Sequence, residues 1–218
     1  MVGNQSKTMT SSLTILTMKE FFEDILKLPY LPNSQSDSQH ENQVADVFRD
    51  HGFVIISKKE FKQKYSSNYS LLPDMIAVQQ PNGSQQHPDF VFKINGKIYA
   101  LECKSGSDKK TSPMYNSTNP CVDTFYVFGC KKYNKTTVFL GGDVMPEGIR
   151  KRIERAWSVM EAIIDETNDE LSEMEENNRG WQLYPRRMVI QQGPKDMVDY
   201  FIHSERSWCE QNVLNFNW

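Results

Sequence analysis

The chain has 218 residues, of which 38% are hydrophobic and 24% are charged, and its formal net charge is −3. This composition is typical of one globular unit and excludes an intrinsically disordered protein. The slightly acidic charge excludes binding to nucleic acid through bulk positive charge, although a local basic cleft remains compatible with it.

The N-terminal residues 1–37 are expected to form an arm that begins polar and contains one short packing helix. Thr17 is placed to cap this helix, and Pro29 follows its end. Apolar residues then recur at helical spacing between Ser38 and Gly52, which predicts a second helix. The residues expected to face the core are Phe21, Phe22, Ile25, Leu28, Val44, Val47, Phe48 and His51.

Short apolar runs separated by turn residues predict a sheet in the middle of the chain. Strands are expected at 52–57 and, as a pair, within 87–106 and within 123–142, with a short basic helix at 58–66. The apolar segment at the start of 71–86 is left open between strand and loop. The fold class is therefore α/β (α+β), with a central β-sheet flanked by helices.

The C-terminal part, residues 143–218, is expected to be rich in helix. Asp143 and Pro146 are placed as the cap and first residue of a long helix that fades into EENNRG. A strand at 184–191 and a final helix from Lys195 follow. The long helix has an apolar stripe that predicts core packing or, alternatively, a dimer contact. The stripe consists of Ile149, Ile153, Trp157, Met160 and Ile164.

Cysteine spacing and apolar runs bear on the environment of the protein. The four cysteines form no CxxC pair, so they indicate neither a zinc ribbon nor a disulfide framework. SLTILTM is too short and polar for a signal-peptide core, and no run approaches the roughly 18 apolar residues of a membrane span. We expect a soluble cytoplasmic protein with reduced thiols. These are Cys103, Cys121, Cys130 and Cys209.

A two-residue turn sets the register of the strands within 87–106. Asn95-Gly96 is a strong hairpin signal, because a type I′ turn needs positive φ at both central positions. Counting outward from this turn places Asp89 opposite Glu102, with β-carbons roughly 5 Å apart. Lys104 lies on the same face, and the other face is expected to be core. The core residues are Phe90, Phe92, Tyr99 and Leu101.

Two opposed acids destabilise a sheet unless a cation, a proton or a function compensates. Mg²⁺ fits best, because it prefers one or two carboxylates together with water and phosphate oxygens. Lys104 would then orient the attacking water and offset negative charge on the phosphorus centre. We favour this role over that of a free general base, because nearby carboxylates and a metal shift the pKa of Lys104 in opposite directions.

PDF at residues 88–90, followed after a hairpin by ECK at 102–104, resembles the signature of the PD-(D/E)xK nucleases. The resemblance implies a restriction-endonuclease-like core and phosphodiester hydrolysis with one or two Mg²⁺ ions, for which Mn²⁺ can substitute. It also implies Asp89 and Glu102 as metal ligands, the backbone carbonyl of Cys103 as a further ligand, and Lys104 as the catalytic lysine.

The family often has one more acid on the helix before the first core strand, and Glu41 in SQHENQVADVF occupies that place. The resemblance extends from the Glu41 helix to VFLGG, about half of the chain, and makes residues 38–142 the expected catalytic core. The N-terminal arm and the C-terminal third of the chain lie outside this resemblance.

Other interpretations remain for several of these residues. The acid pair and Lys104 could form an ion pair on an exposed strand edge, Glu41 could simply favour a helix N-terminus, and Asp74 in LLPDM is a rival acid after proline. Candidate DNA contacts lie in the long loop after ECK and in YPRRM, where a polar surface is the alternative. They are Lys109, Lys110, Tyr115, Asn116, Arg186 and Arg187.

The sequence thus predicts a Mg²⁺-dependent endonuclease acting on double-stranded DNA. A type II restriction enzyme that forms a homodimer is the leading hypothesis, because two-fold protein symmetry matches a palindromic site. The alternatives are a structure-selective nuclease, such as a junction resolvase or repair nuclease, and a non-catalytic DNA-binding module that retains the sheet as a scaffold.

Overall fold

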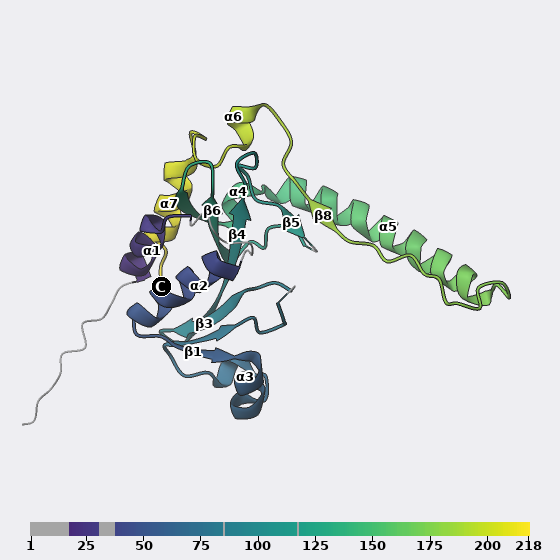
Figure 1. Cartoon of the computed structure of the whole chain (residues 1–218), viewed down its shortest axis with the longest axis horizontal. Coiled ribbons are helices and arrows are strands. Elements are labelled where there is room, and N and C mark those ends of the chain that lie inside the picture. The colour runs from purple at the N-terminus through teal and green to yellow at the C-terminus, as the bar shows by residue number, and fades with distance from the viewer. Residues whose placement is uncertain (1–17, 31–37, 85, 117) are drawn as a thin grey trace, which may run out of the picture.

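The computed structural model describes residues 18–30, 38–84, 86–116 and 118–218 (Figure 1). It has the expected mixed α/β fold, in which helices flank a six-stranded sheet and one long helix projects from the rest. The predicted cap Thr17 lies outside the described residues. Among the described residues, none of the helices combines the length and apolar character that a membrane crossing requires.

The sheet is built from segments rich in β-branched and aromatic residues. Its strands are β1 (Val54–Ser57), β2 (Ile76–Gln79), β3 (Phe90–Ile94), β4 (Lys97–Gly106), β6 (Thr124–Cys130) and β7 (Lys135–Leu140). Their spatial order is β1-β2-β3-β4-β6-β7; β1/β2 and β4/β6 are parallel, and the other neighbours are antiparallel. The segment left open by the sequence is therefore β2, which lies inside the sheet.

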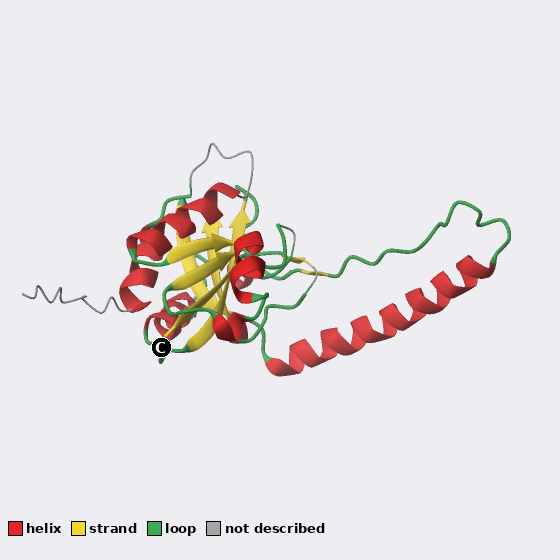
Figure 2. Ribbon diagram, turned by 90° about the horizontal axis from the view of Figure 1, so that it is seen from below, coloured by secondary structure: helices red, strands yellow, loops and turns green. Residues whose placement is uncertain are grey.

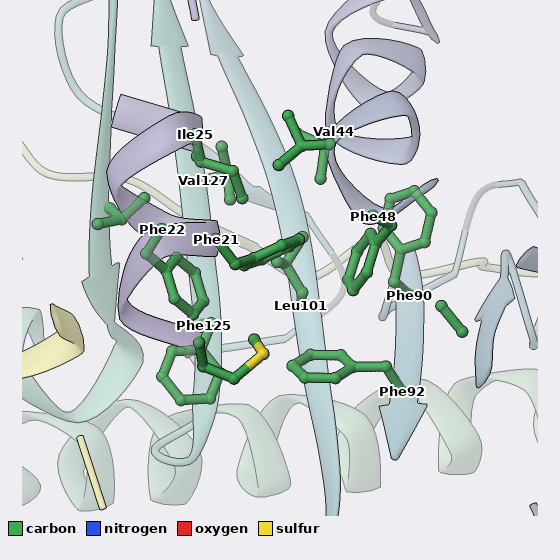
Figure 3. Packing of buried hydrophobic residues seen from close by; sticks show 14 of the residues in the cluster. Phe21, Phe22, Ile25, Val44, Phe48, Phe90, Phe92, Leu101, Phe125 and Val127 are labelled. Atoms are coloured by element: carbon green, nitrogen blue, oxygen red, sulfur yellow. The ribbon is translucent and has the colours of Figure 1, made fainter. Parts of the chain in front are cut away.

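Helices α1 (Met18–Lys27) and α2 (Ser38–Asp50) pack over the larger hydrophobic core (Figure 3). Phe21 and Phe22 from α1 and Phe48 from α2 are almost fully buried beside Phe90 and Phe92 of β3. The ring centroids of Phe48 and Phe90 lie 5.2 Å apart. The predicted core faces of both helices and of the hairpin are confirmed, and this packing fixes α2 next to β4.

Two smaller hydrophobic clusters complete the body of the protein. One joins α3 (Lys58–Tyr65) and the 3-10 helix η1 (Tyr69–Leu71) to β1 and β2 through Phe61 and Leu72. The other surrounds Tyr126 and Phe139 and includes β5 (Tyr115–Asn116) and β8 (Met188–Val189), which form a separate antiparallel pair. The protein therefore has packed layers beyond the α1–α2 core.

The start of the long helix differs from the sequence prediction. Asp143 lies within a short helix, α4 (Gly141–Val144), and accepts a hydrogen bond from Asn212 at 3.1 Å. The long helix α5 (Glu147–Glu173) begins after Pro146, which is the N-cap residue. Arg150 anchors its first turn, because its buried guanidinium donates to the carbonyl oxygens of Pro120, Gly141 and Met145.

Beyond this anchor, α5 projects away from the sheet (Figure 2). Arg150 is the only buried residue of α5, and Ile149 and Met160 from the predicted stripe are 53% and 41% exposed. The expectation of core packing is therefore wrong for most of this helix. An apolar stripe at helical spacing looks the same in the sequence whether it faces the core or packs against one neighbouring segment. Here Trp157 of the stripe contacts Arg187 in the segment that follows α5.

The C-terminal elements are shorter than expected. Only Met188–Val189 of the predicted strand at 184–191 is in a strand, and the predicted final helix is two helices, α6 (Lys195–Val198) and α7 (Arg206–Leu214). Asp199 lies between them with a fully buried side chain that accepts a hydrogen bond from Tyr133 at 2.7 Å. This polar contact holds a bend where the sequence suggested a continuous helix.

Candidate active site

The hairpin register that brings the two acids together is confirmed. Asn95 and Gly96 have φ angles of 51° and 73°, and the β3–β4 ladder follows the predicted pairing along its length. Asp89 is the residue just before β3, whose first residue, Phe90, pairs with Leu101. Continuing the same register by one pair places Asp89 opposite Glu102. The backbone N–H of Asp89 donates to Oε2 of Glu102 at 3.2 Å.

Asp74, the rival acid, lies at the other end of the hairpin. Its carboxylate accepts from the backbone N–H of Gly96, at 3.0 Å for Oδ1 and 3.2 Å for Oδ2. This contact stabilises the turn. The structure therefore does not bring Asp74 to Glu102.

Asp89, Glu102 and Lys104 form one hydrogen-bonded group. Nζ of Lys104 donates to Oε1 of Glu102 at 2.6 Å, and the backbone N–H of Cys103 donates to Oδ2 of Asp89 at 2.7 Å. Glu102 is 7% exposed, and the side chain of Lys104 is 17% exposed. An ion pair on an open strand edge does not describe this arrangement, because the group is largely removed from water.

The third acid, Glu41, lies in the first turn of α2 and is also buried. Its Oε1 accepts from Nε2 of Gln79 at 2.8 Å, and its Oε2 accepts from Nε2 of Gln80 at 3.1 Å. Its charge contributes to the pKa of Asp89, so the two acids act on each other electrostatically. An exposed helix terminus would need neither the burial nor the two amide donors.

Burial and like charge set the protonation of Asp89. Desolvation, followed by the charge of Glu102, raises the pKa of Asp89 to about 7, although the Cys103 N–H opposes this. Burial also acts to raise the pKa of Glu102, but the hydrogen bond from His87 and the charge of Lys104 outweigh it and lower that pKa. The site thus concentrates negative charge and compensates only part of it.

Asp89→Asn is expected to stabilise the fold when metal is chelated. A carboxyl group with a raised pKa in the folded state costs stability as pH rises from its unfolded value of 3.8 to about 7. The melting temperature of the variant should therefore exceed that of the wild type by several degrees at pH 8, and by less at pH 4. Thermal unfolding monitored by circular dichroism in EDTA measures this difference, and an advantage that shrinks with rising pH contradicts the account.

The donor set is compatible with a hard cation such as Mg²⁺. Asp89 and Glu102 supply carboxylate oxygens from neighbouring strands, and the raised pKa of Asp89 reflects a site that a cation would stabilise. Within the described ranges, no group of three or more His, Cys, Asp or Glu side chains is arranged to hold a metal ion. Two carboxylates would therefore need the carbonyl of Cys103, water or phosphate oxygens to complete the coordination.

A basic groove begins beside Lys104. The cavity has a volume of about 400 Å³ and includes the side chains of Lys104, Lys110, Lys131 and Asn116 in its lining. Lysines positioned along a groove suit a phosphate backbone, whose charge dominates affinity for DNA. The overall net charge of −3 therefore does not describe the surface next to the site.

The predicted DNA contacts differ in where the structure places them. Lys109 and Lys110 line a larger cavity of about 730 Å³ next to the groove, and Asn116 is exposed. Tyr115 is a correction, because it is 2% exposed and packs with its ring centroid 5.6 Å from that of Tyr126. Its side chain is part of the hydrophobic cluster around Tyr126 and Phe139 and is not available to DNA.

Arg186 and Arg187 lie beside the middle of α5, next to Trp157 and Glu161. They line a cavity of about 370 Å³ together with Trp157, Tyr184 and Gln86. The guanidinium carbon of Arg187 lies 5.7 Å from the centre of the Trp157 ring. None of Asp89, Glu102 and Lys104 lines this cavity, and a contact with DNA stays a prediction for both arginines.

His87 is a member of the site that the sequence analysis missed. Its Nδ1 lies 3.1 Å from Oε2 of Glu102, and its Nε2 lies 3.3 Å from Oγ1 of Thr124. His87 lies in a bend before β3, so strand alternation does not predict its contact with Glu102. Gln79 and Gln80 were also missed, because their contacts depend on the pairing of β2 with β3, which no tight turn sets.

If Asp89 and Glu102 hold a metal ion, His87→Gln is expected to reduce the affinity for Mn²⁺ about 10- to 100-fold, because outer hydrogen bonds orient ligating carboxylates. The fold should remain intact. Calorimetric titration measures the affinity, and circular dichroism checks the fold. His203→Gln serves as the control, since His203 lies by a different cavity, and equal effects of the two substitutions would contradict the role of His87.

No family model, curated protein or solved structure matches the chain. The class of protein therefore has to be argued from the site itself.

Proposed function

We propose that this protein is a Mg²⁺-dependent endonuclease that hydrolyses double-stranded DNA at a short specific sequence, as type II restriction enzymes do. The observation that supports this most directly is the pairing of half-buried Asp89 with buried Glu102 beside Lys104. A charged group of this kind lowers stability and is retained where function requires it. Its sequence order and its place on a hairpin resemble the PD-(D/E)xK nucleases.

Asp89 and Glu102, with the backbone carbonyl of Cys103, are the residues that would hold Mg²⁺, and Glu41 is the additional acid of the same site. When bound, Mg²⁺ would supply a positive charge that offsets the charge of the reacting phosphodiester. Lys104 orients the attacking water and stabilises negative charge that develops at phosphorus. His87 and the Cys103 N–H hold the two carboxylates in position.

The basic groove next to Lys104 gives the substrate a path to these residues. Lys110 and Lys131 would contact phosphates of the bound strand, which positions the strand without reading its sequence. Lys109, Asn116, Arg186 and Arg187 are candidates for further contacts, including those to base edges.

Cleavage assays with defined substrates test this proposal. Supercoiled plasmid in Mg²⁺ should give discrete bands with defined ends, and EDTA should stop the reaction. Selective cutting of a four-way junction would instead indicate a structure-selective nuclease. Absence of cleavage in both Mg²⁺ and Mn²⁺ by folded protein, on plasmids that together sample many sequences, would favour the non-catalytic DNA-binding module.

A further inference from the structure

Helix α5 and the segment that follows it form a projection, defined here as residues 147–187, which extends from the body of the protein (Figures 1 and 2). At about 1.5 Å per residue, α5 is about 40 Å long. The returning segment is fixed to it by paired hydrogen bonds between the side chain of Asn168 and the backbone of Leu183, at 3.0 and 2.7 Å. The projection is thus a defined structure and not an extended tail.

One face of α5 is apolar and lies open to solvent. Ile149, Val159 and Ile163 are 53%, 56% and 57% exposed, and Ala156 is exposed between them. Their spacing puts them on one side of the helix, separate from Trp157, which contacts Arg187 of the returning segment. We call this set the outer stripe. A row of large exposed apolar side chains on an isolated helix marks a contact with another molecule.

Charge along α5 is divided between its two halves. Residues 147–158 contain four basic and two acidic residues, whereas residues 159–173 contain six acidic residues and no lysine or arginine. The charged residues on the same side of the helix as the outer stripe follow this division, with Arg152 toward the start of α5 and Glu166 and Glu170 toward its end. All three are exposed. An acidic half of this length repels the phosphate backbone, which argues against DNA as the partner.

We propose that Val159 and Ile163 of the outer stripe bind the same two residues of a second copy of this chain, with the two α5 helices antiparallel. A two-fold contact joins the same surface on both copies, so the surface has to complement itself. Antiparallel helices achieve this, because each basic half then faces the acidic half of the partner. A two-fold axis near residue 161 would place Val159 opposite Ile163 and Arg152 opposite Glu170. The apolar contact then consists of Val159 and Ile163 from each copy, whereas Ala156 and Ile149 lie opposite Glu166 and Glu173.

If the proposed function holds, the dimer would supply two catalytic sites, one for each DNA strand. It does not depend on the proposed activity, however, because association is measured without DNA or metal. A monomer that cleaves DNA would contradict the dimer alone, and a dimer without nuclease activity would contradict the proposed function alone.

Sedimentation analysis of purified protein is the first test. The wild type is expected to have twice the 25.3 kDa mass of one chain. Val159→Glu and Ile163→Glu should each give monomers, because they introduce a charge opposite an apolar side chain. Leu71→Glu is the matched control, since Leu71 is 58% exposed on η1 in the body of the protein. A monomeric wild type, or a dimer that survives both substitutions, would overturn the proposal.

A charge exchange tests the direction and register of the contact. Arg152→Glu and Glu170→Arg should each weaken the dimer at low ionic strength, because each places like charges opposite one another. An equimolar mixture of the two variants should form a heterodimer with two restored ion pairs. Failure of the mixture to associate more strongly than either variant alone would contradict the antiparallel arrangement, and both variants are surface changes that leave the fold intact.

Discussion

Glu102→Gln is expected to abolish DNA cleavage, with a loss of at least about 1,000-fold in turnover. The amide removes the negative charge that would hold the metal but keeps nearly the same volume in a site where Glu102 is 7% exposed. Specific DNA binding should be retained or improved, because one source of repulsion from the phosphate is removed. Cleavage rates and binding measured by electrophoretic mobility in Ca²⁺ separate the two effects.

The matched control for this substitution is Glu60→Gln on α3. Glu60 also accepts a hydrogen bond from a lysine, at 2.6 Å from Nζ of Lys64, but both side chains are exposed. Its loss should leave cleavage unchanged. Full activity in Glu102→Gln would remove Glu102 from the metal site and with it the main support for a nuclease.

Lys104→Met is expected to reduce cleavage by about 100- to 1,000-fold while Mn²⁺ binding is largely retained. Methionine preserves the apolar part of the side chain, so the loss reports on the ammonium group that contacts Glu102 at 2.6 Å. Parallel cleavage assays and calorimetric titrations distinguish a catalytic lysine from one that only stabilises the acid pair.

Lys64→Met is the corresponding control, because it also removes a lysine that pairs with a glutamate at 2.6 Å. If Lys104→Met cleaves DNA normally, the lysine has no role in the reaction. Loss of metal binding together with loss of cleavage would instead make Lys104 a structural member of the site.

Local signals in the sequence predicted the part of the site that lies within one hairpin. The Asn95-Gly96 turn determines the backbone geometry at both central positions, so the position of Asp89 relative to Glu102 could be obtained by counting. Lys104 follows from strand alternation alone. This is the reason why the acid pair was predicted and the partners of Glu41 were not, since Gln79 and Gln80 depend on long-range pairing.

Other predictions failed where one pattern suits two environments. Tyr115 is in a polar loop sequence, but a two-residue strand pairs it with Val189 and buries it. The stripe on α5 has the period of a core-facing helix, although most of this helix is outside the core. Periodicity reports that one face of an element is apolar, and only the tertiary structure determines what covers that face.

Calorimetric titration of Mn²⁺ into the wild type and into Glu102→Gln, without DNA, tests the central claim most directly. The account predicts saturable binding by the wild type and its loss in the variant, because Asp89 and Glu102 supply the charge that attracts the ion. Absence of binding by the folded wild type, or equal binding by the two proteins, would show that the acid pair is not a metal site and would contradict the proposed nuclease mechanism.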